Sequence, residues 1–372
     1  MGLKVIVVGN DHYNTLNVVR ALGVAGFSVD VWIISEKSKS FVLKSRYAGE
    51  GGCVREDEVI DFLLSKYKAA RERIPLITTY DGAAVLVDSK YDRLSGKFCL
   101  PSVGHVQGRL IEAMNKDFQV QAAADAGMHV PGSISLNLTE RYERELDDVD
   151  YPCIVKPRES FKASKEEFRI CENREKLVEC LESLNGVVPE VLVQQFIPND
   201  EVIVVGGVRT PQGEVYIYGE VNKEKHSSSS HNLGLCCLGY WERGCRSEEL
   251  CRRLLKDMDY YGCFSIDFIR SHGHREGEEK DYFIEVNLRT DGLFFFYTQA
   301  AVNYPAIWAS ACYGLPVEVA PAEKRIIGMN EILYLRNYLS LSSIGDFFKT
   351  DVFSTFSFKD FRPFLFRILN KL

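Results

Sequence analysis

The chain of 372 residues lacks several features that would assign it to a class at once. Its most apolar long stretch, residues 292–315, is interrupted by Gln299, Asn303 and Pro305, so we expect no transmembrane segment. The first residues lead directly into a short apolar strand pattern, and we expect no export signal. Positive charge is also scarce, because 45 Lys and Arg residues face 52 Asp and Glu residues and the formal net charge is −7. A nucleic-acid partner is therefore not expected, since binding phosphate backbones requires a basic surface.

The 11 cysteines are present without the spacings that mark metal or disulfide frameworks. No Cys-x-x-Cys occurs, Cys236 and Cys237 are adjacent, and Cys245 and Cys251 are six residues apart. The 7 histidines do not accompany them at zinc-ligand spacing. We expect reduced, mostly buried thiols in a cytoplasmic protein.

Apolar residues make up 46% of the chain, which is enough for two or three packed domains. In the first third, short apolar strand patterns at residues 4–8, 28–34 and 75–79 alternate with helical patterns at 15–25 and 56–71. Strands separated by helices predict a parallel sheet with helices on both faces. Residues 1–112 are therefore expected to form a Rossmann-like α/β domain.

The turn after the first strand, Gly9–Asn14, lacks the second and third glycines of a dinucleotide-binding loop. An oxidoreductase that binds a nicotinamide cofactor is therefore not favoured. Two interpretations of this loop stay open. It contacts substrate, because open sheets bind ligands at the carboxyl ends of their strands, or it is an ordinary turn whose Asn or Asp caps the next helix.

From residue 113 onward the strands carry polar residues at positions suited to a nucleotide and a metal. Asp267 lies in one predicted strand, and Glu285 and Asn287 lie two residues apart in the next, hence on one face of it. Joined by a hairpin, these strands bring three oxygen ligands together, which suits Mg²⁺. The alternative is that these residues form the solvent face of the strand.

Three further positions fit a nucleotide. Lys156 ends an apolar strand before Pro157 and places a point charge where phosphate oxygens can reach it. Residues 194–197 (Gln-Gln-Phe-Ile) combine backbone donors and acceptors with an apolar surface, as an adenine ring requires, and Glu201 can accept hydrogen bonds from ribose hydroxyls. Each position alone is also compatible with a solvated lysine or an ordinary core residue.

Taken in order, these motifs resemble those of the ATP-grasp superfamily across residues 112–292. The motifs are Asn115-Lys116-Asp117, Gly127–Pro131, Tyr151–Pro157, Val193–Pro198, Ile266-Asp267-Phe268 and Ile284–Arg289. The resemblance implies an α/β and α+β fold, with a Rossmann-like domain at 1–112 followed by a two-lobed ATP-grasp domain. Its small lobe or lid would span 113–205, its large lobe with the metal site 206–330, and a Phe-rich extension 331–372.

The resemblance also implies a role for each candidate residue. Lys116 and Lys156 would bind ATP phosphates, while Gln194, Gln195, Phe196, Ile197 and Glu201 would hold the adenosine. Asp267, Glu285 and Asn287 would bind Mg²⁺ or Mn²⁺. Arg289 and Lys223 would act on the substrate carboxylate or the transferring phosphoryl group, although Lys225 competes with Lys223 for that role.

Two positions depart from the family pattern. The loop at 158–165, which would cover the phosphates, contains no glycine, so Arg158, Lys162 or Lys165 would substitute as charges. Gln195 stands where a glutamate often accepts from the adenine amino group. Neither departure removes a group needed for phosphoryl transfer.

The activity implied by the resemblance is that of a stand-alone carboxylate–amine ligase, similar to the D-aspartate ligase-like enzymes. Such an enzyme phosphorylates a small-molecule carboxylate and lets an amine displace the phosphate. A small-molecule kinase and a non-catalytic nucleotide-binding protein remain alternatives. The loop at 225–234, with four consecutive serines, is either a mobile acceptor-side loop or a flexible linker.

Phenylalanines and basic residues alternate near the C-terminus, where residues 347–366 hold eight of the chain's 22 phenylalanines. Three interpretations of residues 345–372 stay open: a tail packed on the body, a homodimer interface, or a peripheral membrane contact.

Overall fold

The computed structural model describes residues 2–140, 142–157, 169–197, 201–227, 235–272, 279–338, 340 and 343–370. The chain forms two compact units. The first comprises Met1–Met114, Val202–Asp267 and Val286–Leu372, and the second Asn115–Glu201 and Phe268–Glu285. The division into four domains at 112/113, 205/206 and 330/331 stays a prediction.

The N-terminal part of the first unit is a parallel sheet with strand order β3-β2-β1-β4-β5. Its strands are β1 (Lys4–Gly9), β2 (Ser28–Ile34), β3 (Ala48–Val54), β4 (Ile74–Thr78) and β5 (Phe98–Cys99). The connecting helices are α1 (Tyr13–Val24), α2 (Val59–Lys66), α3 (Asp81–Asp88) and α4 (Tyr91–Leu94), followed by α5 (Arg109–Ala113). This arrangement confirms the Rossmann-like fold expected from the alternating strand and helix patterns.

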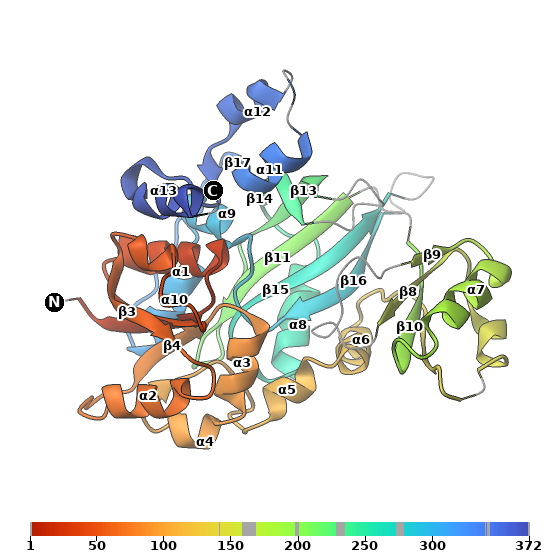
Figure 1. Ribbon diagram of the computed structural model, residues 1–372, viewed down its shortest axis with the longest axis horizontal. Helices are drawn as coiled ribbons and strands as arrows, with labels where there is room; N and C mark the ends of the chain where they lie inside the picture. The colour runs from red at the N-terminus through yellow and green to blue at the C-terminus, as the bar shows by residue number, and fades with distance from the viewer. Residues whose placement is uncertain are drawn as a thin grey trace. The chain divides into compact units, whose positions relative to one another are not determined.

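Both faces of this sheet are buried, as the continuous apolar runs predict. Val5 and Val7 of β1 belong to the core that includes Leu16 of α1, whereas Ile6 and Val8 belong to the core that includes Leu63 of α2. Successive side chains of a strand point to opposite faces, so this alternation requires a helical layer on each side. Figure 1 shows α1 and α2 on the two sides of β4.

The largest sheet of the described residues has the main strand order β16-β15-β11-β13-β14-β17-β18, with β12 and β6 at its margins. These strands are β6 (Ser102–Val103), β11 (Glu201–Arg209), β12 (Val215–Tyr216), β13 (Gly219–His226), β14 (Cys236–Arg243), β15 (Tyr260–Ser271), β16 (Lys280–Asn287), β17 (Ile326–Met329) and β18 (Val352–Phe353). The associated helices are α8 (Glu248–Asp257), α9 (Phe294–Gln299), α10 (Tyr304–Cys312), α11 (Glu331–Tyr338), α12 (Ile344–Lys349) and α13 (Arg362–Leu369). The mixed α/β fold class expected from the sequence is confirmed.

The second unit contains a small sheet with the order β7-β10-β8-β9, in which neighbouring strands are antiparallel. Its elements are α6 (Lys116–Asp125), β7 (Ser133–Asn137), β8 (Cys153–Pro157), β9 (Arg169–Cys171), α7 (Arg174–Leu184) and β10 (Glu190–Gln195). Leu177 and Leu181, four residues apart on α7, pack against Val155 and Val193 of the sheet. This core fixes β8, the strand that carries Lys156.

The thiols match their prediction, since none of the 11 cysteines, all of which the structure describes, forms a disulfide and most are buried. Within the described residues, no helix combines the length and apolar character that crossing a membrane requires.

The C-terminal extension is anchored to the first unit by two buried carboxylates. Glu331, which is 3% exposed, accepts backbone hydrogen bonds from Ser354, Thr355 and Phe356. Asp360, also 3% exposed, pairs with Arg20 of α1 at 2.9 Å. The interpretation of this segment as a packed tail therefore holds for residues 354–360.

We expect Glu331→Ala to lower the free energy of unfolding of the first unit by about 3 kcal/mol, because it leaves buried N–H groups without an acceptor. Unfolding can be followed through tryptophan fluorescence, since Trp32, Trp241 and Trp308 all belong to this unit. The matched control is Glu323→Ala, which alters a carboxylate that is 83% exposed and should change stability by less than about 0.5 kcal/mol. Equal stability of the two variants would contradict the anchoring role.

Candidate functional site

In the second unit, Lys156 lies near the end of β8, where the sequence predicts a phosphate-binding lysine. Its ammonium donates a hydrogen bond to Oε1 of Gln194 at 2.7 Å. Gln194 is 3% exposed and lies on β10, the antiparallel neighbour of β8. The predicted adenine-side residue Gln194 thus has a second use, because it orients the lysine.

Lys116, the first residue of α6, lies close enough to Lys156 to affect its ionisation. Burial is the main cause that lowers the pKa of Lys156 from 10.5 to about 8, and the positive charge of Lys116 adds to it. Glu285 acts in the opposite direction and raises this pKa. The structure therefore brings together Lys116, Lys156 and Glu285, three residues that the sequence assigned to the nucleotide and its metal.

The expected adenine segment departs in part from its prediction. The backbone N–H of Gln195 donates to Gly132 O at 2.7 Å, and that of Phe196 donates to Pro152 O at 2.8 Å. These two donors serve the second unit's own fold. Ile197 is 5% exposed and supplies the apolar character that was expected.

Glu201, the predicted ribose ligand, begins β11 and is 37% exposed at its side chain. It lies 3.4 Å from Nε2 of His272 and 3.9 Å from Nη1 of Arg270. The pKa of His272 is raised, first by its hydrogen bond with Glu279 and then by Glu201. The sequence did not predict these basic neighbours.

In the first unit, Lys223 of β13 lies 3.7 Å from Oδ2 of Asp267 on β15. The two strands flank β11 in the sheet, so both side chains belong to one face. Lys225 is held elsewhere, by Asp346 at 2.5 Å and by the hydroxyl of Tyr334 at 3.1 Å. Of these two lysines, Lys223 is the one that lies beside Asp267, one of the predicted metal ligands.

Arg289 follows β16 and is fixed by several acceptors within the first unit. Its Nε and Nη2 donate to the two oxygens of Asp81 at 2.6 and 3.0 Å, and Nη2 also donates to Oδ1 of Asn287 at 3.2 Å. Asp81 opens α3 directly after β4, at the carboxyl end of the parallel sheet. Sequence reasoning missed Asp81; its place just after an apolar strand was the available signal.

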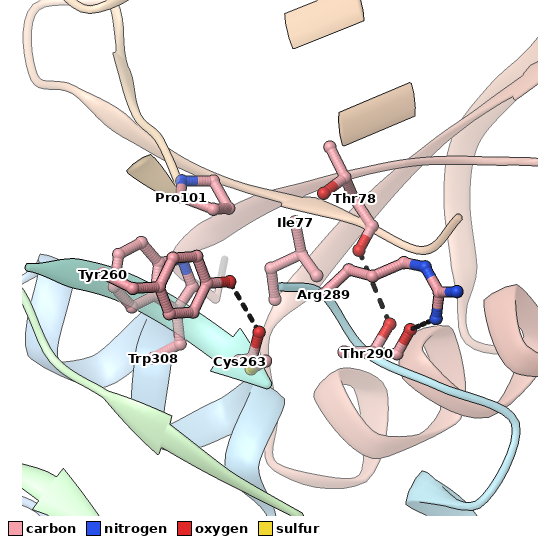
Figure 2. Close-up of a pocket in the computed structure, with 8 residues that line it drawn as sticks. All are labelled: Ile77, Thr78, Pro101, Tyr260, Cys263, Arg289, Thr290 and Trp308. Atoms are coloured by element: carbon pink, nitrogen blue, oxygen red, sulfur yellow. Dashed lines mark hydrogen bonds between the residues drawn. The ribbon is translucent and has the colours of Figure 1, made fainter. Parts of the chain in front are cut away.

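A small pocket of the first unit lies beside Arg289 (Figure 2). Ile77, Pro101, Tyr260 and Trp308 supply much of its lining. The hydroxyl of Thr290 donates to Thr78 O at 3.5 Å, which links the segment after β16 to β4. The segment after β16 that carries Arg289 and Thr290 therefore lies beside the end of β4.

The metal-binding prediction rests on oxygen donors from two neighbouring strands, β15 and β16. Among the residues that the structure describes, no three His, Cys, Asp or Glu side chains form a ready-made metal cage. The predicted set contains two carboxylates and the amide of Asn287, and oxygen-only donors of this kind fit Mg²⁺ that also binds phosphate oxygens. The loops at 158–165 and 228–234, including Arg158, Lys162 and Lys165, lie outside the described residues.

Comparisons with known proteins bear on the family and the fold. Residues 121–276 match the model of the ATP-grasp domain. No curated protein matches the chain. Among the solved structures that share the fold, three are 14–17% identical to this chain.

N5-carboxyaminoimidazole ribonucleotide synthetase from Thermus thermophilus is 17% identical over 87% of this chain and 82% of its own, with a TM-score of 0.65. An L-amino acid ligase from Bacillus licheniformis is 14% identical, with coverages of 86% and 78% and a TM-score of 0.61. The biotin carboxylase domain dimer of Hydrogenobacter thermophilus 2-oxoglutarate carboxylase, in complex with MgADP, ADP and bicarbonate, is 17% identical, with coverages of 88% and 74% and a TM-score of 0.64. The chain therefore contains an ATP-grasp domain and has the fold of ATP-grasp proteins.

Proposed function

We propose that the protein is an ATP- and Mg²⁺-dependent carboxylate–amine ligase that acts through an acyl phosphate. A carboxylate oxygen of the substrate attacks the γ-phosphorus of ATP and ADP leaves. An amine then attacks the acyl carbon, an amide bond forms and phosphate leaves. Similar proteins with this fold include an amino acid ligase and a complex with MgADP.

The observation that carries the proposal is the pair of neighbouring lysines in the second unit. Burial is the main cause that lowers the pKa of Lys156, and the charge of Lys116 adds to it. The phosphates of ATP are the kind of anionic ligand that stabilises both ammonium groups. Gln194 orients Lys156 with a neutral amide oxygen.

Asp267, Glu285 and Asn287 are the residues that would hold Mg²⁺, with Mn²⁺ as the alternative. When bound, the metal ion supplies positive charge to the β- and γ-phosphate oxygens. Lys223, 3.7 Å from Asp267, contributes a further positive charge on the same face. Arg289, held in place by Asp81, is suited to orient the substrate carboxylate.

Two other functions share part of this machinery. A small-molecule kinase would release a phosphorylated product without an amine, and a nucleotide-binding protein would not turn ATP over. The proposed reaction suits the expected cytoplasmic location and small-molecule substrates. A homodimer is one alternative for the assembly. No nucleic acid takes part in it.

ADP release should require both a carboxylate and an amine when the protein is assayed across a matrix of amino acids and amines, with mass spectrometry of the products. We expect Lys156→Ala and Glu285→Ala to lower kcat/KM by about 10²–10³-fold. Lys156 supplies a positive charge to the transferring phosphoryl group, and Glu285 would hold the Mg²⁺ that supplies another. Lys176→Ala and Glu179→Ala, which break an exposed ion pair of the same unit, serve as matched controls and should keep wild-type turnover. Wild-type turnover in Lys156→Ala would refute the site, and amine-independent formation of a stable phosphorylated product would favour the kinase.

Nucleotide affinity should depend on pH through Lys156, whose pKa is lowered to about 8. The protonated form binds phosphate, so we expect MgADP to bind about tenfold more weakly at about pH 9.5 than at about pH 7. Titration calorimetry at several pH values measures this change. In Lys156→Arg the charge persists over the whole range, and a decline of equal size there would assign the pH dependence to another group.

We also propose that the outer face of the C-terminal extension binds anionic phospholipid bilayers. Phe358 and Leu369 are 91% and 63% exposed, and Phe361 and Leu365 are 43% and 44% exposed. Exposed Lys359 and Arg362 lie between these apolar side chains in the sequence. Apolar side chains flanked by basic ones complement an anionic bilayer surface.

This membrane contact can be tested by co-sedimentation with liposomes that contain phosphatidylserine. We expect the double variant Phe358→Ser, Leu369→Ser to reduce binding by about fivefold or more, because both substitutions remove exposed apolar surface. Val187→Ser, which alters a side chain of the second unit that is 69% exposed, is the control. Absence of wild-type sedimentation would refute the membrane contact, and self-association without lipid would favour a homodimer interface.

A further inference from the structure

Arg367 on α13 is a partly buried cation that has no carboxylate within ion-pair distance among the described residues. Its Nη1 donates to the hydroxyl of Thr355 at 2.8 Å, and its guanidinium carbon lies 5.0 Å from the ring centre of Phe41. Burial lowers its pKa, which reflects the free energy needed to remove this charge from water.

Other well-buried arginines of the chain are paired with acids. Such pairs join Arg20 with Asp360, Arg209 with Asp259, Arg270 with Asp281 and Arg289 with Asp81. Arg367 therefore departs from the way this protein neutralises its other enclosed guanidinium groups.

The surroundings of Arg367 include the β1–α1 loop that the sequence singled out as a candidate ligand contact. The backbone N–H of Phe41, whose ring contacts Arg367, donates to Oδ1 of Asp11 at 2.9 Å. The electrostatic influences on Arg367 come from Glu331, Tyr13 and Asp11, in that order. The carboxylate of Glu331 accepts the backbone N–H groups of residues 354–356, and both acids are thus engaged by other donors.

His12 adds a neutral donor to this region. Its Nδ1 accepts the backbone N–H of Asn14 at 3.2 Å, so in the neutral ring Nε2 carries the proton. Burial, then Arg367, then Arg289 lower the pKa of His12 from 6.5 to about 4. The ring therefore stays neutral at physiological pH and is influenced by both arginines.

His12 follows β1 and lies at the N-terminus of α1, beyond the carboxyl end of that strand. The order β3-β2-β1-β4-β5 reverses direction at β1 and β4, and open parallel sheets bind ligands at the carboxyl ends of the strands at such a point. Asn14 is 4% exposed and links the segment after β4 to the segment after β16. Its Nδ2 donates to Thr79 O at 2.6 Å and to Thr290 O at 2.9 Å. Arg289 is the residue next to Thr290 in the chain.

We propose that Arg367 and His12 form an oxyanion subsite for the substrate, which binds a phosphate or a second carboxylate remote from the reacting carboxylate. The guanidinium supplies the charge and the Nε2–H of His12 a further hydrogen bond. Both side chains are partly exposed. The substrate of the ligase is then at least a dianion, an inference that rests on the proposed function for the place of the reacting carboxylate beside Arg289.

The subsite can be tested on the full chain with inorganic phosphate and succinate as separate probes, without turnover. Ring ¹⁵N NMR reports the pKa of His12, and His12→Asn, which keeps an acceptor for the helix cap, assigns its signal. We expect saturable binding of at least one probe to raise the pKa of His12, because a bound anion offsets the neighbouring cations. If phosphate saturates at the lower concentration, the subsite binds a phosphate; if succinate does, it binds a carboxylate.

Arg367→Gln should weaken that binding at least tenfold, and His12→Asn about threefold, as measured by calorimetry. Arg93→Gln, which alters an exposed arginine of the same unit, should bind as wild type does. Should Arg367→Gln fail to fold by tryptophan fluorescence, Arg367→Lys replaces it and should still bind, but at least threefold more weakly. Absence of saturation by both probes, or wild-type affinity in the folded Arg367 variant, would overturn the subsite.

MgADP binding separates this inference from the proposed function. Arg367→Gln should bind MgADP as wild type does, since Lys116 and Lys156 are unchanged. Loss of anion binding in Arg367→Gln with wild-type MgADP affinity supports the subsite even where no amine-dependent turnover is found. Equal loss of MgADP affinity in this variant would overturn it, because Arg367 would then act on the whole protein.

Discussion

The charge of Lys156 is the feature on which the proposed chemistry depends. Lys156 is a partly buried ammonium near a second lysine. Both conditions make it lose its proton more readily than a lysine in water, and they lower its pKa to about 8. Glu285 acts in the opposite direction and raises this pKa. Gln194 fixes the direction of the ammonium with an amide oxygen, which carries no net charge.

The first unit handles its charges differently. Lys223 lies near Asp267 and Arg289 is bound by Asp81, so these cations are balanced before any ligand arrives. Asp267 would hold the metal ion, and the positive charge of Lys223 would then be available to phosphate oxygens. Arg289 keeps its two hydrogen bonds to Asp81, which fix the plane of its guanidinium. The cations of the first unit thus have acidic partners in the structure as it stands.

Features that depend on residues close together in the sequence could be predicted, and contacts between residues far apart in the sequence could not. The position of Lys156 was predictable, because an apolar run followed by Lys-Pro marks both the strand and its end. The parallel sheet was predictable from the same local alternation. The partner of Arg289 was not, since Asp81 lies 208 residues away in the sequence and only the packing of the sheet brings it close. The hydrogen bond from Lys156 to Gln194 is equally non-local, because it depends on the antiparallel register of β8 and β10.

The C-terminal extension is fixed to the helix that follows the β1–α1 loop. Asp360 pairs with Arg20, and Asn17 donates to Ser354 O at 2.8 Å, so the extension is fixed to α1 at two positions of that helix. The loop before α1 carries His12, and α13 carries Arg367. Because α1 and the extension are held together by buried contacts, the backbone positions from which these two side chains extend are set by the fold. A site prepared in this way loses little conformational entropy when an anion binds, which is the physical advantage of drawing its residues from both ends of the chain.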